Sequence, residues 1–585
     1  MMVFILAGSC KKYLDEKVKS DISYSHYETR EGIESGVAAA YNSVRYFFEN
    51  ESSPSLSELG TDMYTDGRDA EFRTQLNRYE ATLNSTFGSG YNYWANLYRG
   101  VTRANYIMDA ISKIGSNMPE EAKKTRMGEL SFLRGYYYFI LVQTYGKVPL
   151  VLEAESGVKT DFTRAPIPDV YNQIISDRRF AIDNLPATQA QYGRATKGAA
   201  QHALAMVYLT RASAVVEQRG QKATDLDSAA HYADAVINSN QYQLVADFED
   251  LWPMANQRNS EVIFSAQFST TQLLNNNSGN RTHLFFGMTY DLKPGMTRSL
   301  EYGRPWNRIV PTRFNILDLY DRKNDSRFYK SFRTVWFANN PNNLPKWQAR
   351  NGFVPPANLV GKNKFNVGDT SIWVTAEQYP AGTNFDSLYA SRSYYYMPMN
   401  RQDNANFFVM LKHLDPTRVG FNDEIGFRDG VIFRLGETYL IAAEAYGRKG
   451  DFATAADRLN VIRKRAAYKN GEEKPGEYCR VEGGDYQDRL ASTESIMEVT
   501  AADLAGQPSF PDFILDERGR ELNGEFKRRW DLNRMEKLVE RVQKYNPTGG
   551  ANVRSYHRYL PIPQNHIDRL DPVGPPEEEQ NEGYF

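Results

Sequence analysis

The sequence predicts a mainly α-helical protein in which helical hairpins form a scaffold and a long irregular segment interrupts them. Apolar residues recur at helical spacing in several stretches before residue 240 and again after residue 430. Small and aromatic side chains face each other across neighbouring helices, as in tetratricopeptide hairpins. Between these stretches, residues 269–429 contain many asparagines and prolines and few helical periods. The expected fold is four tetratricopeptide-like helical hairpins with a large irregular half.

The first predicted hairpin is interrupted. Residues 31–49 carry apolar side chains on one helical face, among them Ile33, Val37 and Val44. A polar stretch with glycines and a proline follows over residues 50–90, and helical spacing then resumes in YWANLYRGVTRANYIMDAI. We therefore expect a helix, a long excursion and a partner helix.

Three more helices are predicted before residue 269. The segment ELSFLRGYYYFILVQTYGKVPLV is helical up to its stop signals, Gly146 and Pro149. Further on, ATKGAAQHALAMVYLTRA and DSAAHYADAVINSNQYQL form an antiparallel pair. Its expected contacts are two small and two large residues: Ala205, Ala235, Tyr208 and Tyr232.

The clearest hairpin is FRLGETYLIAAEAYGRKGDFATAADRLNVIRKRA. One helix is expected to end near Gly450 and the next to begin about Asp451. The order of small, aromatic and glycine residues is that of a tetratricopeptide hairpin. The repeats are diverged and interrupted, which excludes an unbroken solenoid.

The irregular segment, residues 269–429, is the best place for function. Long loops inside a compact domain usually carry function, and four of the seven tryptophans fall here: Trp306, Trp336, Trp347 and Trp373. Most of these rings are expected to pin long loops in place of a regular core. A binding surface needs only one or two of them to face solvent.

Cys10 stands behind a short apolar run in FILAGSCKKYLD. A disulfide with Cys479 is not favoured, because two cysteines do not make the dense framework of a small secreted domain. Residues 1–9 are also far too few to span a bilayer, which takes about 20. Small residues before the cysteine are typical of a lipoprotein signal, whose cysteine carries the lipid. Two features depart from such a signal: no Lys or Arg precedes the apolar run, as in a truncated signal, and Leu6 lies four residues before the cysteine, where a lipoprotein signal usually has Leu three residues before it. A chance free thiol is therefore the alternative.

Composition excludes several functions. The formal net charge is −2 and no basic stripe is present, so nucleic acid is not an expected ligand. The mean hydropathy is −0.60 and no later apolar run approaches 18 residues, so membrane attachment is expected through the lipid only. The 38 Tyr, 31 Phe and 7 Trp suit helix packing and also surfaces that stack on flat ligands.

Catalytic signals are weak. In ERGRELNGEFKRRWDLNR, carboxylates such as Glu517 and Glu521 alternate with arginines, which favours a structural ion-pair network over acid and base chemistry. The seven histidines show no metal-ligand spacing, and neither a P-loop nor a nucleophile elbow is present. The turn at residues 321–327, DRKNDSR, is interpreted as bonded to its own backbone, with a calcium site as the alternative.

Five segments occur in an order that matches one family: the cysteine followed by KKYLD, then RGYYYFILVQTYGKVPLV, RLGETYLIAAEAY with LNVIRKRA, DERGRELNGEFKRRWDLNRM, and YLPIPQNHID. On these segments the chain resembles, nearly end to end, the SusD/RagB family of outer-membrane nutrient-binding lipoproteins. It departs at Phe526, where the family's turn often has Gly, and this leaves the geometry of that turn open.

The resemblance implies a non-catalytic, cell-surface glycan-binding lipoprotein of the outer membrane. It implies no cofactor, and a partner, a SusC-like TonB-dependent transporter on which the protein sits as a lid. Peptide uptake is an alternative, and a glycan-degrading enzyme a weaker one. The expected regions are a signal peptide at 1–9, a lipidated tether at 10–30, an N-terminal region at 31–268, the ligand-facing insertion at 269–429 and a C-terminal region at 430–585.

A ligand site is predicted around SLEYGRPWNRIVPTRF, residues 299–314. In relatives, the segment before the "PT" helix start carries a sugar-stacking aromatic, and Trp306 stands in the matching place. Trp306 also follows a proline in a glycine-bounded loop, which favours display of its ring, although a buried loop pin is the open alternative. Donors for hydroxyl groups come from Arg304, Asn307 and Arg308. The weaker candidates are Tyr290, Tyr302, Tyr64, Asp66 and Arg68.

Overall fold

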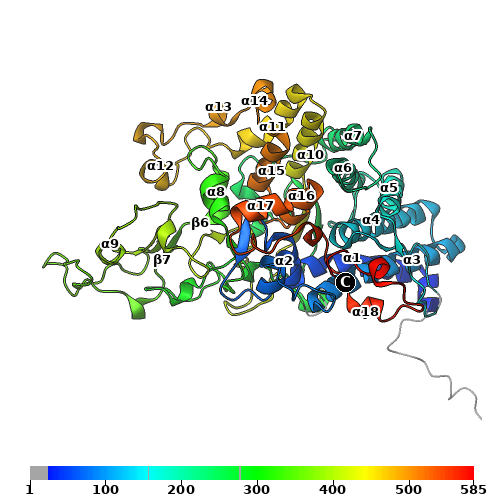
Figure 1. The fold of residues 1–585 in the computed structure, drawn as a ribbon, viewed down its shortest axis with the longest axis horizontal. Helices are drawn as coiled ribbons and strands as arrows, with labels where there is room; N and C mark the ends of the chain where they lie inside the picture. The colour runs from blue at the N-terminus through cyan, green and yellow to red at the C-terminus, as the bar shows by residue number, and fades with distance from the viewer. Residues whose placement is uncertain (1–23, 156, 276–277, 585) are drawn as a thin grey trace, which may run out of the picture.

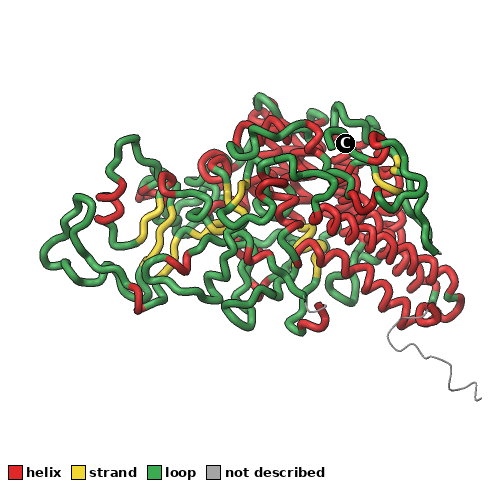
Figure 2. The backbone as a smooth tube through the Cα atoms, turned by 60° about the horizontal axis from the view of Figure 1, so that its bottom comes forward, coloured by secondary structure: helices red, strands yellow, loops and turns green. Residues whose placement is uncertain are grey.

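The computed structural model describes residues 24–155, 157–275 and 278–584. The expectations for the signal peptide and for Cys10 lie outside the described residues. The chain is mainly helical, as predicted. Its long helices gather on one side, and loops with short strands make up the other (Figure 1, Figure 2).

Four pairs of neighbouring helices form the scaffold. The pairs are α1 (Arg30–Glu49) with α3 (Gly88–Lys113), α4 (Glu120–Tyr145) with α5 (Ile167–Asn184), α6 (Lys197–Ser213) with α7 (Asp225–Ile237), and α10 (Leu435–Arg448) with α11 (Phe452–Ala466). Consecutive pairs also pack on each other, α3 on α4, α5 on α6 and α7 on α10. The predicted hairpin scaffold is therefore confirmed, with the excursion inside the first pair and the long insertion before the last.

Capping residues account for the helix ends. The Thr29 hydroxyl accepts a hydrogen bond from the Gly32 backbone N–H at 3.0 Å and caps α1. Asp451 caps α11 by accepting from the Thr454 backbone N–H at 3.1 Å. Gly146 follows α4 with a φ of 70°, a left-handed conformation that glycine adopts without steric cost.

Small and large residues let the helices approach closely. At Gly100 of α3, a Cβ atom would lie 2.4 Å from the ring of Tyr137 on α4. The Tyr137 hydroxyl then reaches α1, where it donates to the Ala40 carbonyl at 2.6 Å. On α6 and α7, the rings of Tyr208 and Tyr232 stack with centroids 6.0 Å apart. These contacts build one hydrophobic core along the stack.

The insertion has a second hydrophobic core of its own. Buried residues from separate loops meet there, among them Phe285, Phe328, Trp336, Ile372 and Met397. Strands β7 (Val335–Phe337) and β8 (Thr370–Val374) pair antiparallel, and β9 (Tyr395–Met397) joins β8 in parallel. This small sheet lies toward the end of the molecule opposite the hairpins (Figure 1).

Short elements complete the chain. The other strands are β1 (Tyr64–Asp66), β2 (Val148–Pro149), β3 (Arg164–Ala165), β4 (Val262–Ala266), β5 (Ile309–Pro311), β6 (Phe332–Arg333), β10 (Val409–Met410) and β11 (Gly430–Arg434). The other α-helices are α2 (Ser52–Glu58), α8 (Arg327–Ser331), α9 (Phe385–Ser391), α12 (Glu477–Arg480), α13 (Glu494–Met497), α14 (Ala501–Ala505), α15 (Phe510–Glu521), α16 (Arg528–Arg534), α17 (Leu538–Tyr545), α18 (Gln564–Ile567) and α19 (Pro576–Glu579).

Phe526 packs against both cores. Its ring stacks on His413 with centroids 5.1 Å apart and meets the edge of Phe48 at 5.9 Å. Its φ is 62°, and Gly524 just before it has a φ of 70°. The turn therefore keeps a left-handed backbone at Phe526, where the family often has glycine, and aromatic packing holds the larger side chain there.

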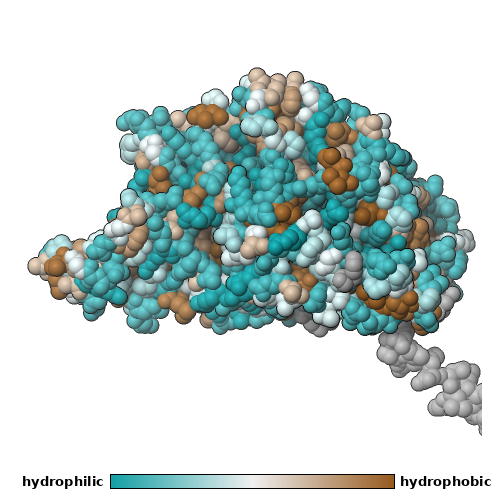
Figure 3. Space-filling model, viewed as in Figure 1, coloured by the Kyte–Doolittle hydropathy of each residue, from teal (hydrophilic) through white to brown (hydrophobic). Residues whose placement is uncertain are grey.

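The surface of the described part is mostly hydrophilic on the face drawn in Figure 3. Among the residues that the structure describes, none of the helices combines the length and the apolar composition needed to cross a bilayer.

Candidate ligand-binding surface

Two segments far apart in the sequence meet beside Trp306. Strand β1, from the excursion, pairs antiparallel with β5, which follows the Trp306 loop. The backbone N–H of Gly67 donates to the Arg308 carbonyl at 2.8 Å, and that of Asp69 to the Asn307 carbonyl at 3.2 Å. A Cβ atom on Gly67 would lie 2.1 Å from the Asn307 carbonyl oxygen, so this approach requires glycine. The fold thus brings together the two regions from which the sequence predicts a site.

A third segment supports the loop from behind. The Trp306 backbone N–H donates to the Leu284 carbonyl at 2.8 Å, and the Asn307 N–H to the Gly287 carbonyl at 3.0 Å. The Trp306 ring is half-buried and packs edge-on against Phe285, with centroids 5.9 Å apart. Main-chain bonds therefore fix the position of Trp306, and part of its ring stays exposed.

Three guanidinium groups surround the Trp306 ring. Those of Arg281, Arg308 and Arg304 lie 5.0, 5.2 and 5.9 Å from its centroid. All three side chains are partly exposed. A partly exposed aromatic ring with planar donors close to it can pack against a sugar ring, while the donors form hydrogen bonds with the sugar hydroxyl groups.

Two carboxylates hold these arginines. Glu424 pairs with Arg304 at 3.0 Å and also with Arg281, while Glu51 pairs with Arg308 at 2.9 Å. Burial raises the pKa of Glu51 to about 7, and the charge of Arg308 opposes that rise. The cations are thereby oriented around the ring before any ligand binds.

The predicted site residues fall into two groups. Trp306, Arg304, Arg308 and Arg68 reach the surface, and the Arg68 side chain is 51% exposed. The other five are buried: Tyr64, Asp66, Tyr290, Tyr302 and Asn307. A buried side chain cannot touch a ligand directly, so these five could only support a binding surface from beneath.

The buried tyrosines are joined to the backbone and to each other. The Tyr290 hydroxyl donates to the Gly303 carbonyl at 2.8 Å, at the start of the Trp306 loop. The rings of Tyr290 and Tyr302 meet edge to face at 5.5 Å, and the Phe337 backbone N–H donates to the Tyr302 hydroxyl at 3.1 Å. They brace the loop against the second core.

Asp66 and Asn307 also have structural contacts. Asp66 accepts from the Asn77 side-chain amide at 2.7 Å and pairs with Arg78 at 3.1 Å and with Arg73. Asn307 has a φ of 59°, a region that asparagine tolerates better than most residues. Both residues shape the backbone on which Trp306 is displayed.

Sequence reasoning missed Arg281, Glu424 and Glu51. Each lies far from residue 306 in the chain and comes from a segment without a recognisable motif. They are brought together by the pairing of β1 with β5, by the packing of residues 284–287 under the loop and by the antiparallel bridge between Asn280 and Gly426. A local sequence signal could not have identified them.

The other three tryptophans of the insertion differ in exposure. Trp336 is buried in the second core, as expected for a ring that pins loops. Trp373 is half-buried, donates to Glu477 at 2.6 Å and carries the Arg480 guanidinium 3.7 Å from its centroid. Trp347 is half-buried, with the Lys364 ammonium 4.6 Å from its centroid.

The segment with alternating charges forms a buried network, as interpreted from the sequence. Glu521 pairs with Arg434 at 2.7 Å, with Arg327 at 2.9 Å and with Arg465. Glu517 also pairs with Arg327, at 2.8 Å. Burial alone would raise the pKa of Glu521, but these guanidinium groups hold it below its usual value. A carboxylate held charged by three arginines is a poor general acid.

The turn at residues 321–327 is closed by its own groups. The Asp325 N–H donates to the Asp321 carbonyl at 2.7 Å, and the Asp325 carboxylate is engaged by Arg327 at 2.7 Å. Among the described residues, no cluster of three His, Cys, Asp or Glu side chains has the geometry of a metal site. The arrangement fits an acidic turn bonded within itself.

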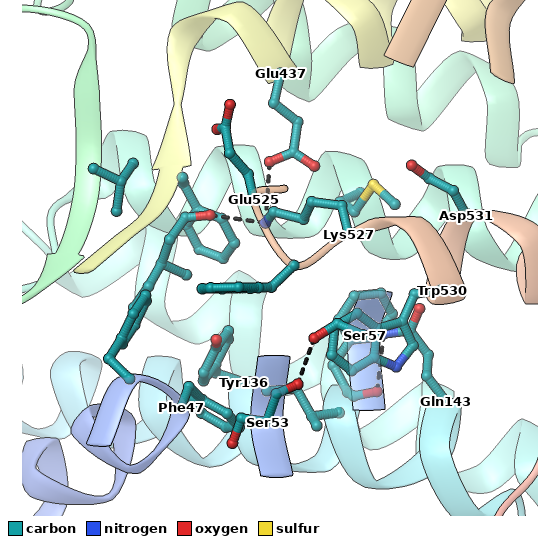
Figure 4. A pocket seen from close by; sticks show the side chains of 18 of the residues that line it. Phe47, Ser53, Ser57, Tyr136, Gln143, Glu437, Glu525, Lys527, Trp530 and Asp531 are labelled. Carbon is teal, nitrogen blue, oxygen red and sulfur yellow. Dashed lines mark hydrogen bonds and ion pairs between the residues drawn. The ribbon is translucent and has the colours of Figure 1, made fainter. Parts of the chain in front are cut away.

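A cavity of about 100 Å³ lies inside the helical half (Figure 4). Its walls are largely aromatic and aliphatic, with Phe47, Tyr136 and Trp530 among them. The Lys527 ammonium lies 3.3 Å from Glu437 and donates to the Ile432 carbonyl at 2.8 Å. Because this cation is already paired, the cavity does not offer a free positive charge to a ligand.

Comparisons with known proteins agree with this architecture. A family model described as starch-binding and associating with the outer membrane matches residues 12–209, and the SusD family model matches residues 260–584. A SusD-like protein of Bacteroides ovatus is 28% identical over 271 residues, which are 45% of this chain and 48% of that protein. A SusD-like protein of Formosa agariphila is 24% identical over 98% of this chain and 97% of its own length.

The fold is also similar to solved structures. A laminarin-binding SusD-like protein matches with a TM-score of 0.65 at 21% identity, covering 95% of this chain and 100% of that one. SusD family proteins are binding proteins without catalytic activity. The SusD family model alone matches more than half of the chain. The chain therefore belongs to the SusD family.

Proposed function

We propose that this protein captures a glycan at the cell surface and delivers it to a SusC-like TonB-dependent transporter of the outer membrane. The observation that carries the glycan-binding part is Trp306, a half-buried ring with three guanidinium groups close to it, on a loop held by main-chain bonds. Family membership and the laminarin-binding relative support a glycan as the ligand. Delivery to a transporter rests on the family resemblance alone.

The test is Trp306→Ala, with isothermal titration against the glycan that the wild type binds best in an array. Loss of a stacking ring is expected to weaken binding by on the order of 1 to 3 kcal/mol, roughly 5- to 150-fold. The melting temperature should change little, because the ring is only half-buried.

Trp336→Ala is the matched control. That ring is 1% exposed in the second core, so its loss should cost about 3 to 5 kcal/mol of stability. Full affinity in a folded Trp306→Ala protein would remove this ring from the site. An array on which only peptides are retained would favour peptide uptake, and release of reducing ends from a polysaccharide would favour an enzyme.

A further inference from the structure

A second cavity, of about 350 Å³, lies in the small-sheet end of the insertion, which we call the distal lobe (residues 335–401). Its walls come from residues 345–365, from α9 and from β9 with the residues beside it. Helix α9 lies near the tip of this lobe in Figure 1. The volume falls in the range of small-molecule sites, and it is larger than the cavity of the helical half.

The distal pocket is lined by four cations and one carboxylate. The cations are Lys346, Arg350, Lys364 and Arg401, and the carboxylate is Asp386. Within the described residues, no ion pair of 4 Å or less joins any of these five side chains to an opposite charge. The pocket therefore concentrates positive charge in a protein whose formal net charge is −2.

Arg401 is held in place by aromatic rings. Its guanidinium lies 4.1 Å from the Tyr389 centroid and 3.9 Å from the Tyr395 centroid, and one nitrogen donates to the Tyr396 carbonyl at 3.0 Å. Stacking fixes the plane of the guanidinium and leaves its other N–H groups for an acceptor in the pocket. A fixed, planar donor of this kind suits a carboxylate or a sulfate, which accepts two bonds at once.

Lys364 is oriented toward the same space by neutral groups. Its ammonium donates to the carbonyls of Ala390 and Arg392 at 2.7 and 3.0 Å and lies over the Trp347 ring. Burial lowers the pKa of Lys364, and the charge of Arg350 lowers it further. Since Lys364 and Arg350 are like charges and neither forms an ion pair within the described residues, an anion in the pocket would relieve their repulsion.

The distal pocket is connected to the Trp306 surface through Lys293. The Lys293 ammonium lies 5.0 Å from the Tyr395 centroid and donates to the Asn406 side chain at 2.5 Å. Two residues earlier, the Asn404 carbonyl accepts from the Arg68 backbone N–H at 2.8 Å. Burial lowers the pKa of Lys293, and Arg401 and Arg68 lower it further, so this lysine lies between the two regions.

We propose that the distal pocket binds an acidic sugar residue, through a carboxylate or sulfate group held by Arg401, Lys364, Lys346 and Arg350. The glycan class of the ligand is then an anionic polysaccharide. This inference rests on the proposed glycan-binding function and adds that the glycan carries negative charge.

The test compares three sets of oligosaccharides by isothermal titration: neutral β-glucans, uronate-containing chains and sulfated galactans. The wild type should bind one of the two anionic sets more tightly than the neutral set, and that set identifies the anionic group. The double variant Lys346→Gln/Arg350→Gln changes two exposed side chains, so the fold should be unaffected. It should lose on the order of tenfold or more in affinity for the anionic set and little for the neutral one.

Lys124→Gln/Arg569→Gln is the matched control, because it removes the same charge from exposed positions in the helical half. It should leave all affinities unchanged. Binding of the anionic oligosaccharides should also weaken with added salt, and this effect should be smaller in Lys346→Gln/Arg350→Gln, the pocket variant, than in the wild type.

Two outcomes separate the proposals. If neutral chains bind through Trp306 and the pocket variant changes nothing, the acidic-sugar inference is wrong and the glycan-binding function stands. If no oligosaccharide of any charge binds the wild type, the glycan-binding function itself fails, and the inference fails with it.

Discussion

Two of the described non-glycine residues with a left-handed backbone are Asn307, in the Trp306 loop, and Phe526, which packs against both hydrophobic cores. Such conformations cost roughly 1 to 3 kcal/mol and persist where surrounding contacts determine them. For Asn307 these contacts are main-chain bonds on both sides of the Trp306 loop. For Phe526 they are rings from both cores. Backbone strain is therefore located next to the proposed binding surface and, at Phe526, between the two hydrophobic cores.

A buried carboxyl group close to Phe526 predicts that the free energy of unfolding depends on pH. Glu58 ends α2, is 1% exposed and accepts from the Lys527 backbone N–H at 3.1 Å. Burial raises its pKa to about 8, although that hydrogen bond and the charge of Arg528 oppose the rise. Between about pH 4.5 and pH 8 the folded chain keeps this proton and the unfolded chain loses it, so the free energy of unfolding falls as pH rises.

Glu58→Gln should flatten that decline, because the amide has no proton to lose. Urea titrations of both proteins at pH 5, 6.5 and 8 would measure it, with the exposed Glu31→Gln as the control. A wild type and a Glu58→Gln variant with parallel pH profiles would contradict the prediction.

At the scale of elements, α15 links the halves through charge. Its Glu521 contacts Arg434, at the end of β11, and Arg327, at the start of α8, so one carboxylate joins three elements. Removing one partner from a buried ion pair leaves the others uncompensated, which is costlier than the pair is stabilising.

Glu521→Gln should therefore destabilise the protein by about 3 to 5 kcal/mol, measured by urea unfolding. Glu540→Gln is the control, because Glu540 pairs with Lys537 at the surface and is 60% exposed. Its effect should stay within about 1 kcal/mol. Equal stability of the two variants would mean that the α15 network does not hold the halves together.

Elements with local start and stop signals were predictable. The helices α10 and α11 end and begin within two residues of the predicted positions, because Gly450 and Asp451 act locally. The side chains that contact each other between helices were harder to predict. Tyr208 and Tyr232 are in contact, as predicted, and their rings stack, but the buried small residues of α7 are Ala229, Ala230 and Ala233, and Ala235 is half-buried. Positions two residues apart point to different sides of a helix, and the spacing of apolar residues alone does not show which of them faces the neighbouring helix.

At the scale of the whole molecule, attachment to the membrane is assigned to the proposed lipid on Cys10. A Cys10→Ala chain should therefore leave the membrane fraction in cells that lack the transporter. In cells that have it, a tag on the chain should copurify a large TonB-dependent barrel protein. Cell fractionation after a high-salt wash measures the first, and affinity purification of solubilised complexes the second.

Persistence of Cys10→Ala in washed membranes without the transporter would contradict the lipid anchor. Repeated purification without any barrel protein would contradict the lid arrangement. The two results are independent, because the first concerns residue 10 and the second the folded body.

The sequence could predict only part of the binding surfaces, because many of their residues lie far apart in the chain and meet only in the fold. The partial exposure of the Trp306 ring was predictable, because Gly303 and Pro305 precede it in a loop. The arginines and carboxylates around it were not, and neither was the distal pocket, whose cations come from four separated positions between residues 346 and 401. Such clusters depend on how loops cross, and loop crossings leave no periodic pattern in a sequence.

The main-chain bonds around the Trp306 loop bear on how such proteins diversify. The loop is held by backbone donors and acceptors of residues 67, 69, 284 and 287, and these groups do not depend on the side chain except at position 67, where only glycine fits. Mutations that change the exposed side chains of the loop therefore leave its anchorage intact. Selection can replace the ligand of such a protein one residue at a time, while the architecture is inherited unchanged through long sequence drift.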